Sequence, residues 1–480
     1  MQMRAVLSID PLGFLGPDGH ELNIVKVIRA PWTVPDQGKA HPLQLAAASL
    51  PPWHEPHSVR LRGQRVRDAL SAHPGVARML DLLSNQVGVT PVYLVLGEGE
   101  VELIGWETLC DKGDAFLSLD QRFPIGRIVE PRNDDARAPA SMRPPVRLMA
   151  VIGAMSANGR PEWEHLFKVV KASRSAGLEA ELRLLVGDPD LRDTIDQAVA
   201  DPANAGWLSV SHIDAVGSEV IQAISGWRPQ MIHFFCHGFA DDTDQSLELA
   251  TTSDYLSEAT KGSVIIRTKQ LVGLVEFLPN PWLLTLNCCD TGKAAAALNS
   301  MAHRVVQAGF PAAVAMLEPV NEADAHVFTK AFYGRVFQLL DAVATTLEQS
   351  EDAPFEWLRP MSAVREALVE EHDDVDPTCA REWSLPVLYV RGVAPFCFRK
   401  PIANVTMREA EEYKKRGAIV AQWLVGPGVD LPASVRQDAI AAAMHDVPRA
   451  FWPEVNGTWS TDAVTLGAGP VAGPEVNGGN

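Results

Sequence analysis

The stretch Pro281-Trp-Leu-Leu-Thr-Leu-Asn-Cys-Cys-Asp-Thr-Gly292 is the part of this 480-residue chain around which the expected fold is built. Its apolar run, Trp282 to Leu286, predicts a short buried strand, and the alanine-rich segment from Ala294 predicts a helix. In open α/β sheets, ligands bind at the carboxyl ends of the strands. A cysteine at the end of this strand would therefore lie at a reactive edge of the sheet.

A second stretch, Met231-Ile-His-Phe-Phe-Cys-His-Gly238, has the same form, a buried strand that ends in a histidine and a glycine. A thiol attacks a carbonyl as thiolate and needs a base, and imidazole suits this task near neutral pH. The chain between the two stretches has room for one flap, one helix and one strand, so the two strands could be neighbours in the sheet. The sequence thus predicts a pair in which His237 is the base and Cys289 the nucleophile.

Further residues beside these strand ends could serve the same chemistry. The absence of a side chain on Gly238 would let its backbone N–H approach a substrate closely. The N–H groups of Gly238 and Cys289 could then stabilise the oxyanion of an acyl-transfer intermediate. Asp290, Asp241 and Asp242 would line an acidic pocket that favours a basic substrate side chain.

These residues also have ordinary structural interpretations. A histidine in a buried strand is often a hydrogen-bonded structural residue, and a cysteine there often only packs. His233 is the rival base, although it lies inside its strand, and Cys288 is the rival nucleophile. Side chains alternate along a strand, so only one of Cys288 and Cys289 can face the cleft.

We expect neither a metal nor a cofactor. His54-Glu-Pro-His57 resembles a metal cluster, but it lies in a proline-rich stretch without further ligands, and Cys288 and Cys289 lack the spacing of a zinc knuckle. The sequence contains no phosphate-binding loop, dinucleotide fingerprint or nucleophile elbow.

The alternation of strand and helix patterns divides the chain into three expected units. Residues 1–140 form an N-terminal α/β unit, and residues 141–400 a mostly parallel sheet covered by helices on both faces. Residues 401–480 form a partly helical extension whose glycine- and proline-rich end is expected to be disordered. Within this scheme Val101–Trp106 is predicted as a strand, Asn133–Ala140 as a linker, and Leu385–Gly392 as the strand that closes the sheet.

The composition excludes several function classes. The formal net charge of −18, without a basic cluster, argues against nucleic-acid binding. No apolar run approaches the ~18 residues of a transmembrane helix, and no leader pattern precedes the first strand. The six cysteines are too sparse for a disulfide framework. We therefore expect a cytoplasmic globular protein that neither enters a membrane nor binds nucleic acid.

At the two strand ends the sequence resembles the CHAT family of caspase-like cysteine peptidases, which are related to separase. The family pattern is an apolar strand ending in His-Gly, then a strand ending in Ser-Ala-Cys-Glu-Thr, a helix, and a strand after Ala-Gly. About 50 residues likewise separate the histidine from the cysteine in caspases. Further motifs extend the resemblance over about residues 90 to 395: Gly105–Leu109, Gln307–Leu317, Val320–Asp324, Ala331–Tyr333 and Trp383–Tyr389. Asn287, Cys288 and Asp290 depart from the Ser, Ala and Glu of the pattern.

The resemblance implies a caspase-like fold with His237 as base and Cys289 as nucleophile. It also implies a partner protein as substrate, encoded by a neighbouring gene, for example a gasdermin-like pore former in a bacterial antiviral defence system. An activating partner would order the flap at 241–262 and the loop at 373–381. The N-terminal unit would be a degenerate caspase-like half-sheet.

Two other functions remain open at this stage. One is a non-catalytic caspase-fold scaffold that binds a partner protein. The other is a thiol acyltransferase that is not a peptidase.

Overall fold

The computed structural model describes most of the chain. The described residues are 4–16, 19–55, 57–83, 85–97, 99–130, 141–142, 144–240, 245–278, 280–289, 295–346, 352–372, 375–392, 396–399, 407–424, 431–444, 447 and 451–453. The expected linker at Asn133–Ala140 and the glycine- and proline-rich end at 467–480 lie outside them.

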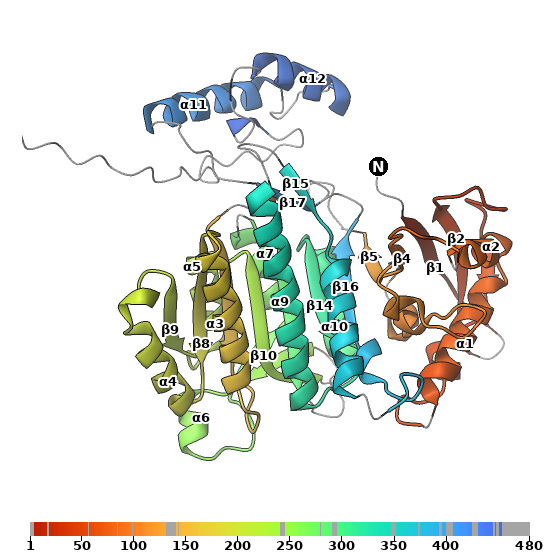
Figure 1. Ribbon diagram of the computed structural model, residues 1–480, viewed down its shortest axis with the longest axis horizontal. Helices are drawn as coiled ribbons and strands as arrows, with labels where there is room; N and C mark the ends of the chain where they lie inside the picture. Colours follow the sequence, from red (N-terminus) through yellow and green to blue (C-terminus); the bar gives the residue numbers. More distant parts are fainter. Residues whose placement is uncertain are drawn as a thin grey trace, which may run out of the picture.

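Within these residues one sheet of fourteen strands runs through the molecule (Figure 1). One block of it has the order β14-β13-β10-β7-β8-β9, and all neighbours in this block are parallel. Its strands are nearly continuous apolar runs, as strands covered on both faces are. The block consists of β7 (Val146–Ile152), β8 (Ala180–Val186), β9 (Leu208–His212), β10 (Met231–Ala240), β13 (Leu283–Cys289) and β14 (Ala312–Met316). The prediction of a mostly parallel sheet is confirmed.

Helices cover both faces of this block (Figure 1). On one face α3 contacts α9, and α10 packs against α9, while on the other α5, α7 and α8 contact one another in turn. An apolar stripe of Trp163, Leu166 and Val170 directs α3 into the core. The bounds are α3 (Arg160–Ser175), α4 (Pro189–Val199), α5 (Gly217–Trp227), α7 (Thr268–Phe277), α8 (Ala295–Gln307), α9 (Glu322–Thr346) and α10 (Leu358–Glu371).

The strand order reverses direction between β7 and β10. From β7 the chain adds β8 and then β9 on one side, and then returns to add β10, β13 and β14 on the other. Such a reversal leaves a crevice outside the carboxyl ends of the two strands at which it occurs. The loop after β7 and the end of β10 therefore flank the place where this fold accommodates a ligand.

A short hairpin follows β10, as predicted. β11 (Gln245–Leu249) pairs antiparallel with the last residues of β10 and with β12 (Val264–Arg267). The connection is less irregular than predicted, because it contains α6 (Thr252–Leu256), capped by Thr251. Asp254 accepts hydrogen bonds from the Thr251 and Ser263 hydroxyls and closes this connection.

The N-terminal unit continues the same sheet. Its strands have the order β3-β2-β1-β4-β5, and β5 pairs parallel with β16. Because β16 is antiparallel to β14, the sheet has two parallel blocks that run in opposite directions. The unit contains β1 (Ala5–Leu15), β2 (Glu21–Arg29), β3 (His41–Leu43), β4 (Val92–Leu96), β5 (Ile125–Val129), α1 (Ser58–Ser71) and α2 (Pro74–Leu83). The division into separate domains stays a prediction.

Two sequence-based expectations are wrong here. The segment corresponding to Leu385–Gly392, β16 (Pro386–Arg391), does not close the sheet but lies between β14 and β5. The segment Val101–Trp106 is not a strand: it lies in two 3₁₀-helices, Glu100–Leu103 and Trp106–Thr108. Its carbonyl groups bind a buried guanidinium instead of a neighbouring strand.

That guanidinium belongs to Arg127, a fully buried residue of β5. It donates to both carboxylate oxygens of Glu107, at 2.7 and 3.1 Å, and to the carbonyls of Glu102 and Ile104. It also donates to the hydroxyl of Tyr389, its register partner on β16. Arg127 therefore joins the N-terminal strands to the rest of the sheet.

The remaining elements stand outside the main sheet. β15 (Asp352–Phe355), β17 (Phe396–Arg399) and β6 (Ser141–Met142) form a small sheet. α11 (Met407–Leu424) and α12 (Ala433–Ala443) pack on each other around Met444 and Phe451. In the part of the chain that the structure describes, none of the helices is both long enough and apolar enough to cross a membrane.

We predict that Glu107→Gln destabilises the protein strongly. The substitution leaves the Arg127 charge buried without its anion, which typically costs about 3–5 kcal/mol. Chemical denaturation followed by circular dichroism measures the loss. As the control, Glu181→Gln removes the partner of the half-exposed Arg147 and should cost less than about 1 kcal/mol. Equal losses in the two variants would contradict the special role of the buried pair.

Candidate functional site

The ends of β10 and β13 meet at one edge of the sheet. The two strands pair in parallel register from Met231 with Leu283 to His237 with Cys289. Parallel neighbours end at the same edge, so the predicted base and nucleophile occupy the same register position. For Cys289 the structure describes only the backbone. The catalytic role of the pair stays a prediction.

The His237 ring is held by a backbone carbonyl from the neighbouring strand on the other side. Its Nε2 lies 2.6 Å from the carbonyl oxygen of Met155, which follows β7. A carbonyl oxygen only accepts, so Nε2 carries the hydrogen and Nδ1 carries the lone pair of the neutral ring. This contact connects β10 with the segment after β7, the two strands at which the strand order reverses, and in the neutral ring it makes Nδ1 the nitrogen that can accept a proton.

The loop that supplies this carbonyl is fixed by three hydrogen bonds. Gly153 donates to the carbonyl of Phe235 and accepts from the N–H of Ala250, both at 2.9 Å. The hydroxyl of Tyr255 on α6 donates to the carbonyl of Ala154 at 2.9 Å. The flap after β10 therefore braces the loop against which His237 rests.

The rival nucleophile, Cys288, lies in the core. Its side chain is 1 % exposed, and its sulfur is 3.5 Å from that of Cys236, its register partner on β10. A disulfide needs about 2.05 Å, so these are two thiols in contact. Solvent does not reach Cys288, which excludes it as a nucleophile in this conformation.

The rival base, His233, belongs to a buried polar cluster beneath the strand ends. Its Nε2 lies 3.0 Å from the Glu162 carboxylate, which also binds His326 Nδ1 at 2.8 Å. The Asn287 amide donates to the same carboxylate at 3.3 Å. Burial alone would raise the pKa of Glu162, but the bonds from His233 and His326 outweigh it and lower the pKa below its usual value.

Among the other predicted site residues, Gly238 is buried and pairs with Leu247 of β11. Its role in an oxyanion hole stays a prediction. The three pocket candidates Asp290, Asp241 and Asp242 lie outside the described residues. The structure therefore brings together His237, Gly238 and the backbone of Cys289, and it leaves the acidic pocket of the sequence-based hypothesis untested.

A different acidic cavity lies at the end of the next strand. It has a volume of about 350 Å³ and follows β14, the parallel neighbour of β13, so it opens at the same edge of the sheet. Its lining includes Glu318, Asp324 and Glu382, together with Arg381. Burial raises the pKa values of Glu318 and of Asp324 above their usual range.

Asp324 is only half satisfied in this cavity. Its side chain is 3 % exposed, and Oδ1 accepts from His372 Nε2 at 2.7 Å. Within the described residues its buried Oδ2 has no hydrogen-bond partner. A buried carboxylate oxygen without a donor favours a ligand that brings one.

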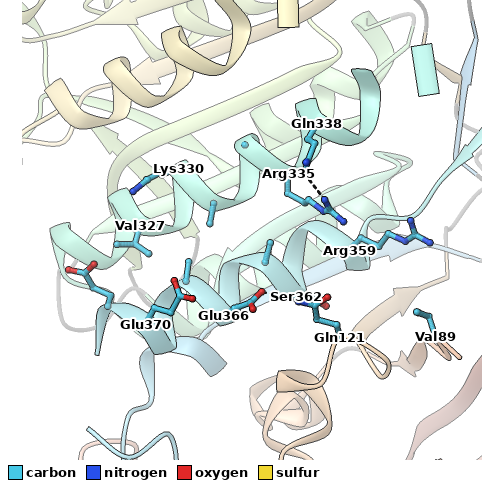
Figure 2. A pocket seen from close by; sticks show the side chains of 15 residues that line it. Val89, Gln121, Val327, Lys330, Arg335, Gln338, Arg359, Ser362, Glu366 and Glu370 are labelled. Carbon is cyan, nitrogen blue, oxygen red and sulfur yellow. Dashed lines mark hydrogen bonds between the residues drawn. The ribbon is translucent and has the colours of Figure 1, made fainter. Parts of the chain in front are cut away.

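A larger cavity of about 850 Å³ lies between α9 and α10 (Figure 2). Arg335 and Arg359 lie toward one end of it, and Glu366 and Glu370 toward the other (Figure 2). None of the predicted catalytic residues lines it. Size alone therefore does not identify the site.

The sequence predicts no metal at His54-Glu-Pro-His57. The His57 ring contacts the thiol of Cys379, with 3.0 Å between Nδ1 and the sulfur. Across the described part of the chain, no group of three or more His, Cys, Asp or Glu side chains is arranged to hold a metal.

Sequence reasoning missed Glu162, His326 and the acidic cavity after β14. Glu162 carried a signal, because it lies four residues before Leu166 on the apolar stripe of α3, where an acid is unexpected. The Met155 carbonyl gave no signal in the sequence, because every residue type carries the same backbone carbonyl. Asp324 lies at the start of a helix, where acidic residues are common.

Comparison with known proteins gives a family. The family model for the CHAT domain matches residues 61–352, more than half of the chain. No curated protein matches the sequence. A crystal structure of the Saccharomyces cerevisiae separase–securin complex is similar at a TM-score of 0.33 and 12 % identity. That match covers 68 % of this chain and 17 % of the other, and a similarity of this strength carries no weight for the fold or for partners.

We predict that Cys236 and Cys288 resist alkylation in the folded protein. Both thiols are buried in the core, so iodoacetamide should label them only after unfolding. Mass spectrometry of peptides, with and without denaturant, measures this. The half-exposed Cys379 is the positive control. Rapid native labelling of Cys288 would restore it as a candidate nucleophile.

Proposed function

Because the chain belongs to the CHAT-domain family, we propose that it is a cysteine endopeptidase in which His237 is the base and Cys289 the nucleophile. The observation that carries the proposal is the shared register position of these two residues at the carboxyl edge of a parallel sheet. The carbonyl of Met155 supports it, since its contact with Nε2 orients the His237 ring.

The proposed reaction has two stages. His237 Nδ1 removes the thiol proton of Cys289, the sulfur attacks the substrate carbonyl, and a tetrahedral oxyanion forms. This intermediate collapses with cleavage of the C–N bond, and the imidazolium gives its proton to the leaving amine. Water, deprotonated by the same imidazole, then attacks the thioester, releases the acid and restores the thiol.

The oxyanion needs donors during both stages. We assign this role to the backbone N–H groups of Gly238 and Cys289, which lie on the two strands that carry the dyad. Such donors act where charge develops, and loss of one costs about 10²–10³-fold in rate in well-studied enzymes.

The proposed substrate carries a basic side chain beside the cut. The cavity after β14 supports this preference, because among the described residues its lining has three acids, Glu318, Asp324 and Glu382, and a single arginine. Asp290, Asp241 and Asp242 remain the residues that the sequence proposes for a pocket of the same preference.

The biological setting is proposed from the family resemblance alone. The substrate would be a partner protein encoded by a neighbouring gene, such as a gasdermin-like pore former in a bacterial antiviral defence system. Cleavage would take place in the cytoplasm. An activating protein partner would act on the flap at 241–262, of which residues 245–262 already contain β11 and α6, and on the loop at 373–381.

We predict that Cys289→Ala abolishes cleavage, because the substitution removes the sulfur that forms the thioester in the proposed reaction. His237→Ala should lower the rate by at least about 100-fold, since the thiol loses its base. Co-expression with proteins encoded beside this chain, followed by mass spectrometry, detects the cut and its position. Cys379→Ala is the matched control and should cleave normally. Cleavage by Cys289→Ala would reject the proposal, and a partner that binds without being cut would favour a scaffold.

We also predict that Glu318→Gln weakens cleavage after basic residues. A hydrogen bond to a charged group contributes about 1.5–3 kcal/mol, so kcat/KM for peptides with Arg or Lys before the cut should fall by about 10- to 100-fold. Matched peptides with Leu at that position test the reason, because they should be little affected. Asp193→Asn, an exposed change on α4, serves as the control. An equal fall for both peptide sets would contradict recognition by charge.

A further inference from the structure

We propose that Glu162 is a positioning residue that holds the two strands carrying His237 and Cys289 in one arrangement. This inference rests on the proposed function and adds to it a residue outside the dyad. Its basis is the buried cluster in which the Glu162 carboxylate bonds to both strands and to α9.

The contacts link every element that carries the site. On β10 the carboxylate binds His233, four residues before His237. On β13 it accepts from the amide of Asn287, two residues before Cys289. Glu162 itself comes from α3, so one carboxylate connects a helix with both catalytic strands.

The first turns of α9 complete the cluster. His326 Nδ1 donates to Glu162 at 2.8 Å, and the Asn287 amide also donates to the carbonyl of Ala325 at 2.9 Å. The same nitrogen lies 3.0 Å from the hydroxyl of Thr329, so its two hydrogens are shared among three acceptors, of which Glu162 is the most distant. Asn287 is thereby held from α3 and α9 at once, two residues before the residue proposed as nucleophile.

Strand geometry places this cluster on the same side as the dyad. Side chains in a strand alternate with a period of two, so positions 233 and 237 share one face of β10, and positions 287 and 289 share one face of β13. The other face holds Cys236 and Cys288, which pack in the core. Movement of His233 or Asn287 would therefore be transmitted along each strand to the face that carries the proposed dyad.

Burying these polar and charged groups costs free energy, which argues for a role of the cluster beyond packing. Glu162, His233 and Asn287 are completely buried. Within the described residues, the cluster leaves His233 Nδ1 and Asn287 Oδ1 without hydrogen-bond partners. Apolar side chains of similar volume often stabilise a core as well as or better than a buried ion pair, whereas directional bonds fix one geometry. The bond to Glu162 raises the pKa of His326 against the effect of burial, so charge reinforces that geometry.

The test measures the reactivity of the Cys289 thiol, which needs no known substrate. Iodoacetamide alkylates a thiolate as iodide leaves. Because the adjacent Cys288 and Cys289 share one peptide, tandem mass spectrometry assigns the label to each cysteine from the peptide fragments and follows it with time. Glu162→Gln removes the charge and keeps the shape. Glu164→Gln, two residues further along α3 and exposed, is the matched control. Cys236 and Cys288 report on general loosening, because they become labelled only when the core opens.

We expect Glu162→Gln to slow alkylation of Cys289 by about 10- to 100-fold while Cys236 and Cys288 stay protected. The Glu164→Gln protein should match the unmodified sequence. If the Glu162→Gln protein does not fold, a second pair of variants tests the same positioning role. His326→Ala should slow Cys289, and His326→Asn should restore it, because the Asn amide can occupy the place of Nδ1.

The outcomes separate this inference from the proposed function. Unchanged Cys289 reactivity in Glu162→Gln, or exposure of Cys236 and Cys288 together with Cys289, overturns the positioning role and leaves the dyad intact. Failure of His326→Asn to restore the rate also counts against it. If His237→Ala leaves the reactivity of Cys289 unchanged, both the dyad and its positioning are rejected.

Discussion

The parallel pairing of β10 with β13 is the constraint on which the candidate site depends. A ladder of backbone hydrogen bonds sets this register over seven residue pairs, and it ends with His237 beside Cys289. A slip of one residue would exchange the faces of a whole strand, and the buried Cys236–Cys288 contact would be lost with it. Core packing and the position of the proposed dyad are therefore fixed together.

The same sheet contains strands from both halves of the chain. Its two blocks run in opposite directions, so only the block with β10 and β13 presents its carboxyl ends at the site edge. The N-terminal strands β1, β4 and β5 are parallel to β16 and end at the opposite edge. The buried Arg127 neutralises Glu107 at this junction and explains why the chain there curls into 3₁₀-helices.

Apolar runs predicted most of this architecture, because strands covered on both faces have few other solutions. The runs at Met231 and Trp282, and the helix at Glu162, were located to within a few residues. The errors arose where a distant group determines local structure: Val101–Trp106 alternates like a strand, but its carbonyls bind Arg127. The place of β16 in the sheet depends on a pairing with β5 that no local pattern encodes.

Some residues of the candidate site could likewise be predicted from local sequence, and others depend on tertiary contacts. His237 and Cys289 could be proposed because each follows an apolar run, and both lie within the residues that the family model matches. Glu162 could only have been suspected as an acid on an apolar stripe, and its partners come from three other elements. Contacts of this kind depend on tertiary packing, which residue spacing does not determine.

The backbone carbonyl that binds His237 limits how substitutions can affect the orientation of the ring. The Nε2 of the ring is held by the peptide group of Met155. Every amino acid carries that oxygen, so no point substitution at position 155 can delete the acceptor. Homologous chains could thus vary freely in residue type there and keep the imidazole orientation, provided that the loop keeps its path.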